Sequence, residues 1–189
     1  NTDGDSLLYD YDGNGYLSQI TNFNGEVYLA NTYDANGRVI SQTVQDEGTF
    51  TFSYDDENRT NTCSGENGYY LSIVYDHMGR IVESTNNDGT KHITYNDLNQ
   101  RTGETDRKGN WTYYEHDSAG NISKVTYPDG LSESYVDRAD NQIVSKTDRN
   151  GHTVFYTYDG NNNLTGVTDA KGNEVSYTYD AARNMTGYT

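Results

Sequence analysis

The sequence has little of several residue types that mark common protein classes. Its 189 residues contain 1 Pro, 1 Cys, 1 Trp and 2 Met, and hydrophobic residues make up only 32%. The single cysteine, Cys63, excludes a disulfide within the chain. No run of about 18 apolar residues is present, so no helix is expected to insert into a membrane. No signal peptide is visible at Asn1.

Positive charge is also scarce. The chain has 13 Lys and Arg against 29 Asp and Glu, which gives a formal net charge of −16. The basic residues are scattered along the chain and make no patch of the kind that neutralises phosphates. Nucleic acid is therefore not an expected partner.

Tyrosine and glycine are the abundant residues. A low hydrophobic content with a large net charge is typical of disorder. Here, however, 19 Tyr and 4 Phe supply large rings, and the polar tip of tyrosine suits a partly hydrated interior. The 19 Gly, with many Asn and Asp, indicate many turns. We expect an ordered all-β chain whose apolar content is mostly tyrosine.

Tyr-Asp pairs recur along the chain at intervals of about 21 residues. The intact copies are Tyr11-Asp12, Tyr33-Asp34, Tyr54-Asp55, Tyr75-Asp76, Tyr158-Asp159 and Tyr179-Asp180. Degenerate copies in the same phase are assigned to Tyr95-Asn96, His116-Asp117 and Val136-Asp137. The sequence therefore predicts about nine units of 20–22 residues, in a single repeat array that spans residues 1–189.

Each unit carries two turns, and a glycine or asparagine suits the positive φ that such turns need. In the first turn this residue follows the Asp by three positions, at Gly15, Gly37, Asn58, Gly79, Asn99, Gly120 and Asn162. The second turn is built on Asp/Asn-x-x-Gly, with glycines at Gly25, Gly48, Gly68, Gly89, Gly109, Gly130, Gly151 and Gly172. Each unit is thus predicted to be two strands joined and followed by these turns, that is, a β-hairpin.

The residues between the turns alternate as they do in strands. Phe50, Phe52 and Tyr54 fall on one face of an extended segment. After the first turn the apolar spacing is odd, as with Ile122 and Val125, which indicates either a β-bulge or partial cover of both faces. Open sheets of more than about ten strands usually curl. The expected fold is therefore tandem β-hairpins in a curved or spiralling antiparallel β-strip.

The pattern Tyr-Asp-x-x-Gly-x-Leu followed by Thr-Asp-x-x-Gly, as from Tyr158 to Gly172, resembles the YD repeat, also called the RHS (rearrangement hot spot) repeat. The resemblance covers Tyr11 to Thr189. It implies a piece of a large bacterial secreted or cell-surface protein, in which a spiral strip forms a shell around a toxin domain. It also implies carbohydrate binding as an alternative. The Asp-Pro motif of self-cleaving shells is missing, because Pro128, the only proline, lies in a repeat turn.

We therefore expect a non-enzymatic structural module that uses no cofactor. Its partners would be the rest of the parent protein, the toxin domain and, through unpaired edge strands, further copies of the chain. The alternative is a carbohydrate or cell-wall glycan binding module. For this alternative Trp111 is the first candidate contact, because it lies in opposite phase to His116.

Two kinds of reactive site were weighed against the repeat. Asp10, Asp12 and Asn14 resemble the opening of an EF-hand calcium loop, but its twelfth position is Thr21, where the loop needs Glu. The four histidines have no zinc-like spacing, and the repeated Asp residues are equivalent, whereas glycosidases need two carboxylates in different environments. The sequence thus predicts neither a catalytic nor a metal site.

Overall fold

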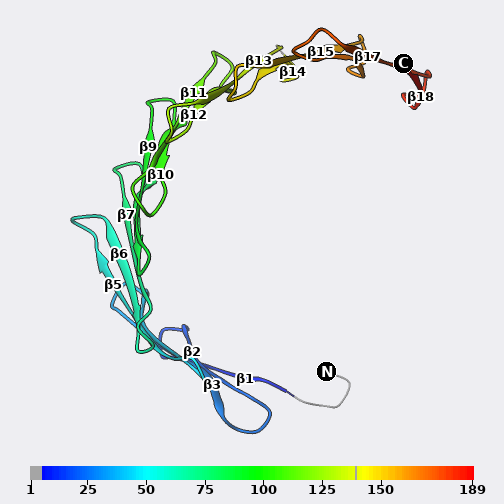
Figure 1. Ribbon diagram of the computed structural model, residues 1–189. Helices are drawn as coiled ribbons and strands as arrows, with labels where there is room; N and C mark the ends of the chain where they lie inside the picture. Colours follow the sequence, from blue (N-terminus) through cyan, green and yellow to red (C-terminus); the bar gives the residue numbers. More distant parts are fainter. Residues whose placement is uncertain (1–5, 139) are drawn as a thin grey trace. The chain divides into compact units, whose positions relative to one another are not determined.

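The computed structural model describes residues 6–138 and 140–189, and these residues form strands and turns without a helix (Figure 1). None of the described residues belongs to a helix long and apolar enough to cross a membrane. The strands are β1 (Leu8–Tyr11), β2 (Leu17–Thr21), β3 (Val27–Tyr33), β4 (Val39–Val44), β5 (Gly48–Asp55), β6 (Thr60–Gly65), β7 (Tyr70–Tyr75), β8 (Ile81–Asn86), β9 (Gly89–Tyr95), β10 (Arg101–Thr105), β11 (Trp111–His116), β12 (Ile122–Thr126), β13 (Ser132–Asp137), β14 (Ile143–Thr147), β15 (Thr153–Tyr158), β16 (Leu164–Thr168), β17 (Glu174–Tyr179) and β18 (Met185–Tyr188).

Each strand pairs antiparallel with the next strand of the chain, from β1 to β18. The chain divides into two compact units. The first ends at His92 and the second begins at Ile93, both within β9. The first half of β9 pairs with β8 and its second half with β10. The predicted all-β fold of tandem hairpins is confirmed.

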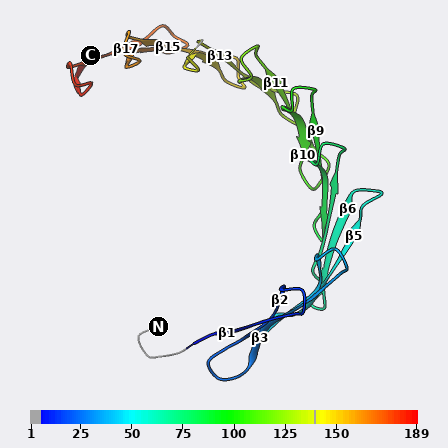
Figure 2. The ribbon, with the colours of Figure 1, turned by 180° about the vertical axis from the view of Figure 1, so that it is seen from behind.

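Each of these two compact units is a single layer of sheet. Within the second unit, strands β10 to β17 follow one another along an arc, and the view from behind shows no second layer over them (Figures 1 and 2). No hydrophobic side chain of the described residues is buried. Among their polar residues, Thr105 is buried, with 2% of its surface exposed. Each hairpin is therefore stabilised by its neighbours in the strip rather than by a closed core.

A β-bulge after each first turn explains the odd apolar spacing. Val125 lies opposite Tyr114 and Ile122 lies opposite His116, with a register shift between the two pairs. One extra residue in β12 therefore turns both apolar side chains to the face that carries Tyr114. The same shift recurs in the other hairpins of this kind, except β5–β6, whose register is continuous. Of the two alternatives left open by the sequence, the bulge is correct.

The two faces of each unit differ in chemistry. One, here called the tyrosine face, carries the residue before each first turn, a position we call the tyrosine slot. The slots are Tyr11, Tyr33, Tyr54, Tyr75, Tyr95, His116, Asp137, Tyr158 and Tyr179. The opposite face carries cross-strand hydroxyl pairs, such as Ser53 with Thr62 at 2.6 Å and Thr147 with Thr153 at 2.9 Å.

We expect alanine to be tolerated differently at two glycines of the first turns. Gly15 (φ +85) has open space where a Cβ would be, whereas a Cβ on Gly37 (φ +77) would overlap the phenol of Tyr16. Tyr16 is held by stacking on Tyr33 at 5.0 Å. Both substitutions cost about 1–2 kcal/mol of left-handed backbone strain, and Gly37→Ala adds about 1–3 kcal/mol of overpacking. Urea unfolding measures the difference, and equal losses would contradict it.

Candidate functional site

The first turn of each unit, here called the corner, is held by one carboxylate. In the first corner, the N–H groups of Asn14 and Tyr16 both donate to Asp12 Oδ1 at 2.9 Å. The Asp12 N–H donates to the Tyr16 carbonyl at 2.8 Å, and the Gly15 N–H donates to the Asp12 carbonyl at 3.0 Å. The Asp side chain thus satisfies backbone groups that the strands leave free.

The second carboxylate oxygen binds a side chain four residues further on. Asp34 Oδ2 accepts from Arg38 Nε at 2.8 Å, and Asp159 Oδ2 accepts from Asn163 Nδ2 at 2.8 Å. Arg38 also binds Asp56 of the following unit, with a closest distance of 2.7 Å. Corners of neighbouring units are therefore linked along the edge of the strip.

The turns on the other edge, predicted from Asp/Asn-x-x-Gly, use the same bonding. Asp169 Oδ1, for example, accepts the N–H groups of Lys171 and Asn173, both at 2.8 Å. Asn22, Asp106 and Asp148 bind the backbone in the same way. All eight glycines assigned to this turn take positive φ. A sequence signal was present, because these Asp and Asn residues also precede a glycine by three positions.

Two corners depart from the sequence assignment. The degenerate copy assigned to Val136-Asp137 is wrong by one residue, because Arg138 makes the corner's backbone bonds and Asp137 pairs with Ile143 as a tyrosine slot does. In the β5–β6 hairpin the residue with positive φ is Arg59 and not Asn58, since this longer turn lacks the bulge. In both places the strand register identifies the residues of the turn, and the resemblance to a Tyr-Asp pair does not.

Phenol groups tie neighbouring units together on the tyrosine face. Tyr54 donates its hydroxyl to the Val39 carbonyl at 2.7 Å, and Tyr179 donates to the Leu164 carbonyl at 2.8 Å. Tyr33 and Tyr158 make the equivalent bonds, so the acceptor lies 15 or 16 residues earlier in each case. The slot tyrosine thus fills space with its ring and binds the preceding unit with its hydroxyl.

Removing one of these hydroxyls should cost stability without loss of the ring. We expect Tyr54→Phe to lower the free energy of unfolding by about 1 kcal/mol, because the Val39 carbonyl loses its donor. Tyr75→Phe is the matched control, since among the described residues none accepts a hydrogen bond from the Tyr75 hydroxyl. Chemical denaturation compares the two variants, and a loss as large for Tyr75→Phe would contradict the assignment.

Corner bonding favours the ionised carboxylates. Partial desolvation raises the pKa of Asp76, but the N–H and guanidinium of Arg80, with the Met78 N–H, outweigh it and lower the pKa to about 2. The backbone N–H four residues on is the largest cause of the lowered pKa of Asp34, Asp117 and Asp148. A side-chain amide four residues on has this role for Asp106, Asp159, Asp169 and Asp180.

These shifts predict acid sensitivity. Because the pKa of Asp76 is lower when folded, its contribution to stability is present above about pH 4 and is lost as the pH falls toward about 2. Asparagine keeps the turn without the charge, as Asn96 does by binding the N–H groups of Leu98 and Gln100. A chain with Asp34, Asp76 and Asp117 all changed to Asn should therefore show a shallower decline of melting temperature over this pH range. An unchanged decline would refute the account.

Among the described residues, no reactive cluster forms at the calcium-like residues or at Cys63. In the part of the chain that is described, no group of three or more His, Cys, Asp or Glu is placed to hold a metal ion. Asp12 Oδ1 is used by the corner, and Asp10 lies in β1 opposite Gln19, so the structure adds nothing to the resemblance of Asp10, Asp12 and Asn14 to a calcium loop. Burial raises the pKa of the Cys63 thiol, which makes it a poor nucleophile.

Trp111 lies on the face opposite the tyrosine slots. It pairs with Thr105, and its ring stacks on Tyr113 with centroids 5.4 Å apart and an interplanar angle of 8°. The two rings flank Gly103, where a Cβ would come within 3.2 Å of both. The glycine therefore lets the aromatic pair lie close against the sheet, with Tyr113 50% exposed.

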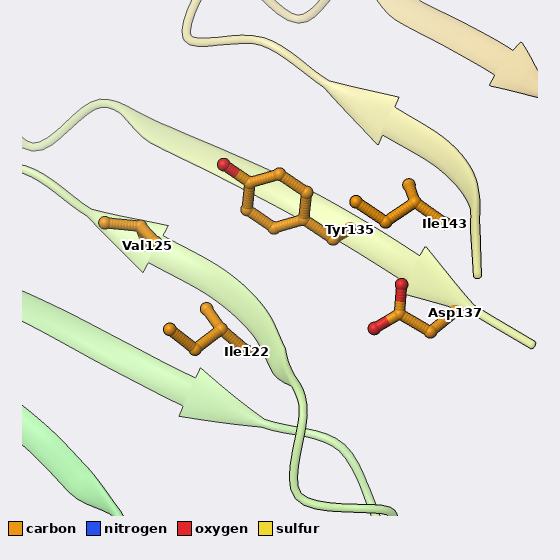
Figure 3. A pocket seen from close by; sticks show the side chains of 5 residues that line it. All are labelled: Ile122, Val125, Tyr135, Asp137 and Ile143. Carbon is orange, nitrogen blue, oxygen red and sulfur yellow. The ribbon is translucent and has the colours of Figure 1, made fainter. Parts of the chain in front are cut away.

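Among the hollows on the tyrosine face, one of about 230 Å³ lies beside the filled slot of Tyr54, and two lie beside slots that lack tyrosine. Of these two, one of about 280 Å³ is lined by Arg101, Tyr114, His116 and Ile122. The next, of about 230 Å³, is lined by Ile122, Val125, Tyr135, Asp137 and Ile143 (Figure 3). These two are shallow depressions in the strip, with side chains from β10 to β14.

A sequence profile described as the RHS Repeat matches residues 95–132, 137–174 and 158–189. Residues 95–132 and 137–189 thus match RHS repeats, and the hairpin units in the rest of the described chain share their period of about 21 residues. The comparison with curated proteins finds no match.

Two solved structures share the fold. The crystal structure of TcdB2-TccC3-Cdc42 is 13% identical, with a TM-score of 0.62 over 97% of this chain and 12% of that chain. The crystal structure of TcdB2-TccC3 without its hypervariable C-terminal region is also 13% identical, with a TM-score of 0.63 over 97% of this chain and 12% of that one. This chain therefore spans only a small part of the length of the proteins it matches.

Proposed function

We propose that the chain is a structural, non-catalytic module of a larger bacterial RHS protein that is secreted or displayed on the cell surface. In this proposal the strip of hairpins forms part of a wall that encloses or presents a toxin or effector domain. The whole described chain, residues 6–138 and 140–189, acts as one stretch of repeat array within the domain expected over residues 1–189.

The bonding between units is the observation that carries this proposal. Corner carboxylates bind the backbone and, through Arg38, the next unit, while slot phenols such as Tyr54 bind the preceding one. Groups that are already engaged in holding the strip together are poorly placed to act as acids, bases or nucleophiles. Repetition of one bonding pattern along the chain favours an extended wall over a single reactive site.

The comparisons support a place within a longer protein. The fold match covers nearly the whole of this chain but only 12% of the TcdB2-TccC3 chain, and it persists in the structure that lacks the hypervariable C-terminal region. The likeness thus lies outside the hypervariable C-terminal region of that protein. By analogy, we place the effector of the parent protein outside the present chain, on its C-terminal side.

Electron microscopy of the full-length parent protein tests the proposal. We expect the hairpin strip to continue from both ends of this chain and to lie beside or around the effector domain. A matched parent truncated after its repeats should keep the same strip and lose only the effector density. A parent in which this chain forms a small closed domain away from the effector would refute the proposal.

Glycan binding remains a second candidate at one place, the stacked Trp111–Tyr113 pair, because sugars bind on exposed aromatic surfaces. A glycan array with the wild-type chain and with Trp111→Ala tests it. Phe155→Ala is the matched control, since Phe155 is an aromatic residue that is 53% exposed. Binding that only Trp111→Ala abolishes would support the site, and absence of binding would remove it.

A further inference from the structure

Asp137 occupies a position that is tyrosine in most other units. It lies opposite Ile143, as Tyr158 lies opposite Leu164 and Tyr179 opposite Met185. The side chain at this position is therefore short and acidic, whereas seven of the nine slots carry a ring and a hydroxyl. Both the volume of the ring and the hydrogen-bond donor are missing there.

Two observations mark this position. A hollow of about 230 Å³ lies beside Asp137, lined by Ile122, Val125, Tyr135 and Ile143. Figure 3 shows the carboxylate of Asp137 and the side chain of Ile122 pointing into the same gap from β13 and β12. Asp137 Oδ1 is buried and has no hydrogen-bond partner among the described residues. A buried acceptor without a partner is costly, and a ligand that donates to it removes the cost.

Filled slots elsewhere in the chain indicate what fits. Tyr158 and Tyr179 each place a phenol in this position and donate to a carbonyl 15 residues earlier, those of Ile143 and Leu164. The corresponding carbonyl for residue 137 belongs to Ile122, to which an ionised carboxylate has no hydrogen to donate. A cavity of roughly 150 Å³ with apolar walls already accepts a benzene ring. The hollow is large enough for a phenol.

The polar groups at the edge of the hollow already have partners. Lys146 Nζ lies 3.2 Å from Glu133 Oε2 and 5.4 Å from the centre of the Tyr135 ring, and Tyr135 donates its hydroxyl to Glu133 at 2.7 Å. Asp137 Oδ1 is thus the acceptor there without a partner among the described residues. The apolar walls of the hollow favour a ring that carries a donor over a bare cation, whose desolvation is costly.

We propose that the hollow beside Asp137 binds the phenol side chain of a tyrosine from a partner polypeptide, whose hydroxyl donates to Asp137 Oδ1. The ring lies against Ile122, Val125 and Ile143 and takes the place of a slot tyrosine in the reverse orientation, because its hydroxyl lies at residue 137 and not at the carbonyl 15 residues earlier. This proposal rests on the tyrosine face itself and does not depend on whether the module belongs to a toxin shell.

NMR titration of the intact chain with p-cresol, the side-chain analogue of tyrosine, tests the proposal. We expect saturable shifts in the amide signals of Ile122, Val125 and Ile143 at millimolar p-cresol. Toluene, which lacks the donor, should bind about tenfold more weakly, since a hydrogen bond to a charged acceptor is worth at least that factor. Equal binding of the two rings, or stronger binding of methylammonium, would overturn the proposal.

Two variants and one control complete the test. Asp137→Tyr fills the slot from within the chain and should abolish p-cresol binding while raising the melting temperature. Asp137→Ala keeps the hollow and should bind both rings alike, so the test stands even if the tyrosine variant fails to fold. Val136→Thr changes the neighbouring residue, which is 57% exposed, and should leave p-cresol binding unchanged. Binding that survives Asp137→Tyr would place p-cresol elsewhere and refute the site.

Discussion

The hydrogen bonds from a corner carboxylate to two backbone N–H groups are the interaction on which the rest of the chain depends. A single-layer strip has no closed core, so its strands keep their register only if the turns between them are rigid. Asp12 Oδ1 provides this by binding the N–H groups of Asn14 and Tyr16. The same bonds recur at both edges of the strip, and the ion pair between Arg38 and Asp56 extends them from one unit to the next.

Tyrosine suits such a strip better than an aliphatic residue would. Its ring lies on the face to which the bulge turns the apolar residues, and its hydroxyl reaches the carbonyl of the preceding unit, as from Tyr179 to Leu164. A side chain with a polar tip can do this while half exposed to water. The resulting scaffold is held together between neighbours and open on both faces, which suits a structural repeat module.

Most of the fold could be predicted from the sequence, because glycines and tyrosines recur with the same period of about 21 residues. The misses share one cause. Val136-Asp137 resembles a Tyr-Asp copy, yet the structure places Asp137 in the tyrosine slot and Arg138 at the corner. Asn58 was likewise assigned a conformation that Arg59 adopts. Register depends on backbone pairing with both neighbouring strands, and a degenerate motif in one strand carries no information about those partners.

The sequence by itself determined the repeat length, the hairpin architecture and the face on which the tyrosines lie, because these follow from local turn chemistry and strand alternation. Tertiary structure alone decided where the bulges bring side chains together and which slots are incomplete. The orphaned Oδ1 of Asp137 and the hollow between β12, β13 and β14 are of this second kind. They arise where three consecutive strands pair, and the register of that pairing is not encoded by any one strand alone.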